Sequence, residues 1–240
     1  MLVTNPRKIN HEELRVVAAE AKGSIKHLFL HWTGCQYGQV FDDYHINIDE
    51  HGEIYLTCRT LHDRKEHTWH RNTGAVGITL CCAKDAVLNY HSIPDYKGCP
   101  PTALQIEQMA IVIAILCREL ELEISFDTVR THAEVADQDD YGPAKHPSDM
   151  RWDLYRLTDL PDTQNLCPGG VVLRKKAKAY SKAMLTAQLL HLPEDPMLTH
   201  LFGGVKSPLS RLRRQLPPME PLCYNPHFLS SKGVLSLWQQ

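Results

Sequence analysis

The sequence predicts an α/β fold in which helices flank a central mixed β-sheet, followed by a helical or irregular C-terminal extension. Short strand-like segments alternate with helix-like segments over the first two thirds of the chain. Some of these strands are apolar throughout, which is typical of burial on both faces, and others alternate apolar and polar residues about a turn. A content of 43% apolar and 22% charged residues is typical of a globular protein and excludes a disordered or collagen-like chain.

The first two elements are a helix and a buried strand. Asn10 and Glu13 have the spacing of a capping box, so we expect a helix from about His11 to Lys22. The segment His27 to Thr33 is a short, mostly apolar run that ends at Gly34, which is typical of a buried strand.

A hairpin and a second buried strand follow. Residues 44–49 and 53–56 alternate with period two about a Glu-His-Gly turn and predict a hairpin. The apolar run from Gly74 to Cys82 predicts another buried strand. A hairpin beside buried strands indicates that the sheet is mixed rather than all parallel.

The longest helix is expected to open near Pro100. Thr102 and Gln105 are spaced as a cap, and a further strand is expected at residues 129–131, after this helix. The apolar residues on or near one face of the helix are Leu104, Met109, Ile113, Leu116 and Leu120.

The charge balance of the chain changes near residue 160. From Pro161 onward 10 Lys and Arg face 4 Asp and Glu, a net charge of +6, whereas the first 160 residues carry −8. We therefore expect one domain over 1–160 and a basic extension over 161–240. In the extension, residues 174–190 can form an amphipathic helix, residues 207–215 a shorter helix, and Cys-Pro-Gly-Gly a loop. The basic residues of that helix either form a solvated face or attract an anionic polymer; they are Arg174, Lys175, Lys176 and Lys178.

Composition excludes several classes of protein. A net charge of −2 argues against a general nucleic-acid binder, and no apolar run is long enough to span a membrane. The N-terminus lacks the apolar segment of a secretory signal, so we expect synthesis in the cytoplasm without a signal peptide. The eight cysteines form no C-x-x-C pair, and we expect most of them to be buried, reduced thiols.

The 14 histidines direct attention to metal and acid–base chemistry. His31 lies at the end of a predicted strand, His132 follows another, and Asp153 comes 21 residues later. Two imidazoles and one carboxylate with an open position form a catalytic rather than a structural zinc set. A strand-end histidine is more often a satisfied core group, so spacing alone leaves both interpretations open.

Five short motifs follow one another along residues 24–157. They are His31-x-Thr33, Tyr44-His-Ile-Asn-Ile, His67-Thr-Trp-His-Arg-Asn72 leading into Val76-Gly-Ile78, Thr131-His-Ala-Glu134, and Arg151-Trp-Asp153. Their types and order resemble the zinc-dependent N-acetylmuramoyl-L-alanine amidase family, which includes phage lysozyme-amidases and peptidoglycan recognition proteins. The tail from residue 161 resembles no wall-binding module.

The resemblance implies one zinc ion held by His31, His132 and Asp153. Glu134 is expected to orient its surroundings rather than to bind the metal. Arg151 stands where the family has a catalytic lysine; a guanidinium can stabilise an oxyanion but cannot act as a proton donor.

The resemblance also assigns the other site residues. One branch of the family has a glutamate base in the strand that here reads Val76 to Cys81 without a carboxylate. The other branch uses a tyrosine, and Tyr44 occupies that position, so we expect Tyr44 to be catalytic, with a packing role as the alternative. His67 and Asn72 match positions that line the substrate groove; the alternatives are a surface histidine and a turn cap.

The implied activity is hydrolysis of the amide that joins the lactyl group of N-acetylmuramic acid to L-alanine, with peptidoglycan as substrate. Water and His67 are both candidates for protonating the leaving amine. The main alternative is a non-catalytic peptidoglycan-binding protein of the same fold, and an unrelated metallohydrolase is a third reading. An intact carboxylate at Asp153 favours the enzyme, because recognition members lose the third ligand.

Such an enzyme would act on the cell wall after lysis-type release or non-classical secretion. A phage endolysin and a secreted antibacterial effector both fit, and a delivery or immunity protein would be the partner of the latter. No nucleic acid is expected as a partner.

Overall fold

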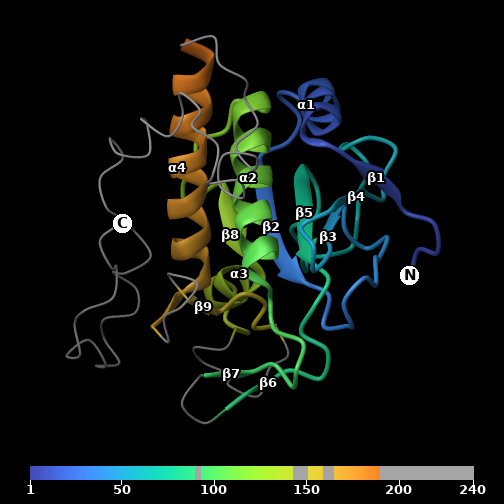
Figure 1. The fold of residues 1–240 in the computed structure, drawn as a ribbon, viewed down its shortest axis with the longest axis vertical. Coiled ribbons are helices and arrows are strands. Elements are labelled where there is room, and N and C mark those ends of the chain that lie inside the picture. The colour runs from blue at the N-terminus through green and yellow to red at the C-terminus, as the bar shows by residue number, and fades with distance from the viewer. Residues whose placement is uncertain (90–92, 143–150, 159–164, 190–240) are drawn as a thin grey trace, which may run out of the picture.

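The computed structural model describes residues 1–89, 93–142, 151–158 and 165–189, which build a six-stranded mixed sheet covered by helices (Figure 1). In spatial order its strands are β1 (Arg7–Ile9), β4 (Ile54–Leu56), β3 (Ile46–Ile48), β5 (Ala75–Leu80), β2 (His27–Trp32) and β8 (Val129–Thr131). β3, β5, β2 and β8 pair in parallel, whereas β4 pairs antiparallel with both β1 and β3. The mixed sheet and the hairpin predicted from the sequence are confirmed.

Three helices form a layer over one face of this sheet. They are α1 (His11–Glu20), α2 (Ala103–Glu119) and α4 (Gly169–Leu189), with α2 between the other two (Figure 1). Both predicted capping boxes are present, at the start of α1 and of α2. Every residue of α2 from Gln108 to Cys117 is buried, because sheet, α1 and α4 surround it. The predicted apolar face of this helix therefore extends around nearly its whole circumference.

The two faces of β2 point into different surroundings. Leu28, Leu30 and Trp32 join the main core beneath α2. Phe29 points the other way and packs with Val135 of α3 (His132–Gln138) in a separate small cluster. Because side chains alternate along a strand, His31 lies on the same face as Phe29. His31 thus faces away from the layer of α1, α2 and α4.

Regular secondary structure in the last described segment, residues 165–189, begins earlier along the chain than the sequence predicts. Cys-Pro-Gly-Gly was expected to be a loop, but it contains the end of β10 (Leu166–Pro168), which pairs with β9 (Arg156–Thr158), and the start of α4. The glycines there meet close neighbours: a Cβ on Gly169 would lie 1.9 Å from the Leu154 carbonyl oxygen. Glycine at the start of α4 therefore permits close packing.

Helix α4 shares the core of the first 160 residues. Val172, Leu173 and Ala177 belong to the same buried cluster as the sheet residues beneath α2. The division at residue 160 remains a prediction, and the part of the extension from 190 onward, with a second helix expected near 207–215, lies outside the described residues.

One interpretation of the sequence required the basic residues of α4 to form a solvated face, but two of them are buried. Arg174 and Lys176 are buried and form ion pairs with Glu134 and Glu107. Neither is therefore available to an anionic polymer.

Within the described part of the chain, no helix combines the length and the apolar composition needed to cross a membrane. Six of the described cysteines carry free thiols, and Cys167 is disulfide-bonded.

Candidate metal centre

Two adjacent parallel strands bring the predicted histidine ligands together. In the pairing of β2 with β8, Leu30 lies opposite Thr131, and the next residues along the two segments are His31 and His132. Their ring centroids are 4.8 Å apart. Since the carboxyl ends of parallel strands meet at one edge of a sheet, this register places both imidazoles at that edge.

An aromatic contact brings Asp153 to the same edge. Trp152 packs edge-on against Trp32, the residue after His31, with ring centroids 4.7 Å apart. The Ala133 backbone N–H donates a hydrogen bond of 3.4 Å to the Asp153 carbonyl oxygen. Buried apolar neighbours and backbone contacts thus fix a carboxylate far away in the sequence beside the two imidazoles.

The donor atoms fit a zinc ion. Asp153 Oδ2 lies 3.2 Å from Nδ1 of His31 and 3.2 Å from Nδ1 of His132. Ligands about 2.0–2.1 Å from a tetrahedral zinc stand roughly 3.3 Å from one another. Among the described residues, this is the one group of at least three His, Cys, Asp or Glu side chains that is close enough to share a metal, with all ligand atoms within 4.8 Å.

Electrostatics keeps His31 and Asp153 in the protonation states that bind metal. Burial lowers the pKa of His31 to about 4, and the neighbouring His132 lowers it too, against the hydrogen bond to Asp153. Burial alone would raise the pKa of Asp153, but the charge of His132 and hydrogen bonds from His132 and His31 outweigh it and lower this pKa to about 2. A neutral imidazole and an ionised carboxylate are the forms that coordinate a metal.

The imidazoles continue in a row into the protein. The ring of His67 lies 5.3 Å from that of His31, and the ring of His45 lies 5.7 Å from that of His67. Burial lowers the pKa of His67 to about 2 and that of His45 to about 4, and the other histidines of the row lower the pKa of His67 further. His31, His67 and His45 are therefore uncharged at neutral pH.

Thr68 links two members of the row. Its Oγ1 lies 3.3 Å from His31 Nε2 and 2.9 Å from His67 Nδ1. With a metal on Nδ1, the His31 imidazole would carry its proton on Nε2 and donate it to Thr68, and the Thr68 hydroxyl would then donate to His67. Such outer partners fix the tautomer and the orientation of a metal ligand.

The loop that carries Thr68 is held by Asn72. The Asn72 Oδ1 accepts hydrogen bonds from the backbone N–H groups of His67 (3.2 Å) and Thr68 (2.8 Å), which is the turn-capping alternative left open by the sequence. His67 itself is only 7% exposed, so it is not a surface histidine. Its ring fills the space over Gly77, where a Cβ would lie 2.6 Å from it. Groove-lining roles for His67 and Asn72 remain predictions.

Tyr44 and Arg151 differ in their relation to the metal centre. The Tyr44 ring lies 5.2 Å from that of His31, and burial, together with the nearby Asp153 and Asp43 charges, raises the pKa of its phenol. Tyr44 is therefore a neutral hydroxyl beside the predicted ligands. The Arg151 side chain is exposed and its guanidinium lies over the Tyr141 ring, 5.1 Å from the centroid.

Sequence reasoning missed two groups that contact the site or its surroundings, Thr68 and Arg174. Thr68 lies inside a motif that was noticed only for its histidine and asparagine. Arg174 donates two hydrogen bonds to Glu134, but it lies in the tail, where no motif pointed to the site. Thr131 and Glu134 also form a capping box at the start of α3, which was not predicted, and neither was the partner of the Glu134 carboxylate.

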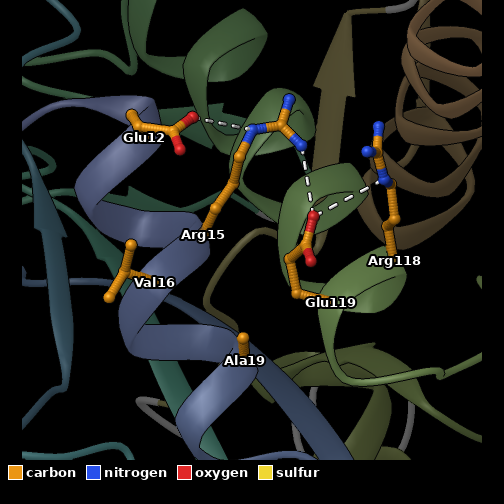
Figure 2. A pocket seen from close by; sticks show the side chains of 6 residues that line it. All are labelled: Glu12, Arg15, Val16, Ala19, Arg118 and Glu119. Atoms are coloured by element: carbon orange, nitrogen blue, oxygen red, sulfur yellow. Dashed lines mark hydrogen bonds and ion pairs between the residues drawn. The ribbon is translucent and has the colours of Figure 1, made fainter. Parts of the chain in front are cut away.

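A surface hollow between α1 and α2 is separate from this centre (Figure 2). The charged groups inside it pair with one another: Arg15 lies 3.2 Å from Glu119, and Arg118 lies 3.5 Å from the same carboxylate. The hollow adjoins the end of α2, from which the chain runs to the start of β8, so it lies at the opposite end of that strand from His132. It plays no part in the proposed chemistry.

Comparison with known proteins agrees with this geometry. The family model described as N-acetylmuramoyl-L-alanine amidase matches residues 21–147, which include His31, Tyr44 and His132 and end before Asp153. No curated protein and no solved structure matches the chain. Since the matched segment spans more than half of the 240 residues, and holds both histidines of the candidate metal centre, the chain belongs to the N-acetylmuramoyl-L-alanine amidase family.

Proposed function

We propose that this chain is a zinc-dependent amidase that hydrolyses the bond between the lactyl group of N-acetylmuramic acid and L-alanine in peptidoglycan. The observation that carries the proposal is the meeting of His31, His132 and Asp153 at one strand edge, with Asp153 Oδ2 3.2 Å from both imidazoles. The intact carboxylate favours an enzyme over a recognition protein, because it completes a set of three ligands.

Zinc bound by such a set polarises a carbonyl and lowers the pKa of a coordinated water toward about 7. The side chains of this protein supply the remaining requirements. Thr68 holds the His31 ring through Nε2. The Tyr44 hydroxyl, beside His31, is proposed to donate a hydrogen bond to the carbonyl oxygen as it gains negative charge, and Arg151 is proposed to add positive charge. Each such contact contributes about 2–4 kcal/mol to transition-state stabilisation.

The reaction balances without any further reactant. The oxygen of water adds to the amide carbon, the C–N bond breaks, and the departing nitrogen takes up a proton. The products are a lactyl carboxylate and a stem peptide with a free L-alanine amino terminus. Each turnover therefore creates one new amine, which can be counted chemically.

The test is digestion of purified peptidoglycan sacculi by the wild type and by His132→Ala. We expect the wild type to release stem peptides with free alanine amino termini, identified by mass spectrometry, and to hold about one zinc per chain. In His132→Ala, a proposed ligand itself is removed. Its zinc affinity should therefore fall by more than the roughly 10–100-fold that removal of a hydrogen-bond partner of a ligand costs. Wild-type protein that holds zinc and binds sacculi without releasing product would instead be a recognition protein.

The substrate places this activity at the cell wall, and we propose that the protein is either a phage endolysin or a secreted antibacterial effector. Host cells that express the wild type in the cytoplasm should remain intact, and cells that export it through an added leader should lyse, whereas His132→Ala should be harmless in both places. An effector would further be neutralised by an immunity protein encoded with it, and an endolysin would not.

A further inference from the structure

Helix α4 contacts the metal-ligand segments although it lies outside the family-matched residues. Its first two residues are packed tightly: a Cβ on Gly169 would lie 1.9 Å from the Leu154 carbonyl, next to Asp153, and a Cβ on Gly170 would lie 2.2 Å from the Glu134 carboxylate. The Gly169 backbone N–H also donates a 3.0 Å hydrogen bond to the Tyr155 carbonyl. The start of α4 therefore touches the chain beside both His132 and Asp153.

Arg174 extends this contact across the segment that carries His132. Its guanidinium donates to both oxygens of Glu134, at 2.8 and 2.9 Å, and to the Val129 carbonyl of β8, at 2.9 Å. Val129 precedes His132 by three residues and Glu134 follows it by two. One planar cation thus joins the strand before the ligand to the helix after it.

The carboxylate that receives Arg174 is part of the cap directly before the ligand. Glu134 Oε2 accepts the Thr131 backbone N–H at 2.9 Å, and Thr131 Oγ1 accepts the Glu134 N–H at 3.2 Å. The Glu134 side chain is 1% exposed, so without Arg174 it would be a buried, uncompensated charge. The capping box would then have to shift, and His132, which lies between its two members, would shift with it.

We propose that Arg174 is a positioning residue for the metal ligand His132, so that α4 belongs to the scaffold of the metal centre. This inference rests on the proposed zinc site. It gives the described part of the basic extension a role in ligand geometry that is separate from wall attraction and delivery.

The same helix provides a matched control. Lys176 is 7% exposed, against 8% for Arg174, and forms an ion pair with Glu107 of α2 at 2.5 Å. The Lys176→Met variant therefore also removes a buried cation from α4, but from a contact with α2, on the far side of the sheet from the ligand-bearing face. Both Met variants should melt at lower temperature than the wild type. Arg174→Met leaves the buried Glu134 carboxylate without its cation, and Lys176→Met removes the cation from the half-buried Glu107, which keeps its hydrogen bond from Tyr180.

The measurement is zinc affinity by competition with a chromophoric chelator, well below the melting temperature of each variant, together with the visible spectrum of the cobalt-substituted proteins. We expect Arg174→Met to weaken zinc binding about 10–100-fold and to alter the cobalt spectrum, as loss of an outer partner does. Lys176→Met should bind zinc with wild-type affinity and give the wild-type spectrum.

Arg174→Lys serves as a second, milder variant in case Arg174→Met fails to fold. It keeps the charge but cannot bridge two acceptors in a planar fork, so we expect a smaller loss of affinity than in Arg174→Met. Wild-type affinity and spectrum in both Arg174 variants would overturn the positioning role while leaving the proposed function intact. An equal loss in Lys176→Met would reduce the effect to general stability and overturn it as well. A wild type that binds no zinc would overturn both proposals.

Discussion

The two faces of the central sheet use the same strands for different purposes. On the face beneath α2, strands β2 and β5 present Leu30, Ile78 and other fully buried aliphatic side chains. On the opposite face the same strands present His31, and Gly77 leaves space for the His67 ring. One face is a close-packed apolar core, and the other is a buried polar layer organised around imidazoles.

The two faces differ in whether their buried atoms find the contacts or hydrogen-bond partners that they need. Apolar contacts need only volume and shape, and the core face meets both. The histidine face buries polar atoms, and Nε2 of His67 and of His132 is buried without a hydrogen-bond partner among the described residues. A buried polar group without a partner costs about 1–3 kcal/mol. Burial of these polar atoms therefore lowers the stability of the protein. If this face holds the proposed zinc ion, substitutions on it should change zinc affinity, whereas substitutions on the apolar face should change stability.

The largest effect on stability is expected on the core face. Ile78→Ala removes a fully buried side chain from β5 and should lower the free energy of unfolding by about 2–5 kcal/mol. Zinc affinity of the folded protein should stay at the wild-type value, because Ile78 points away from the ligands. Chemical denaturation and a chelator competition on the same sample check this. A large loss of zinc affinity would mean that the two faces are not independent.

On the polar face, Tyr44→Phe should act on the reaction rather than on the metal. Loss of one donor to the developing negative charge should reduce kcat by about 30–1,000-fold, equivalent to roughly 2–4 kcal/mol. Zinc content should be unchanged, because the phenol is not one of the ligands. Wild-type kcat in Tyr44→Phe would leave this tyrosine with a packing role only.

The smallest of the three effects is expected for the link between His31 and His67. Thr68→Val keeps the shape of the side chain but removes the hydroxyl between the two imidazoles, and zinc affinity should fall about 10–100-fold. Thr68→Ser retains the hydroxyl and serves as the control. If both variants bind zinc equally well, the orientation of His31 is set by its strand alone.

Local patterns in the sequence predicted most of the fold. Capping boxes at Asn10 and Thr102 and apolar strands at 27–33 and 74–82 depend on neighbours a few residues apart, and the structure confirms these elements within a few residues. The start of α4 was missed because Gly169 normally signals a loop. Here glycine is needed for another reason: a Cβ at this position would collide with the Leu154 carbonyl oxygen, a contact that no local pattern reveals.

In the candidate site, too, the residues themselves could be predicted from the sequence, but their long-range contacts could not. Spacing and resemblance selected His31, His132 and Asp153, and the structure brings them together. Contacts between segments far apart in the sequence escaped prediction, since nothing near Arg174 signals that its partner is Glu134. The same holds for burial: Lys176 and Arg174 look like a solvated stripe until α2 and β8 are placed beside them.

The close fit of Gly169 and Gly170 against the segments that carry Asp153 and His132 has a practical consequence for anyone shortening this protein. A fragment cut at the end of the family-matched residues would lack Asp153, and one cut at residue 160 would expose Leu157 and the Glu134 carboxylate to water. The smallest fragment worth producing should therefore retain the chain through Leu189.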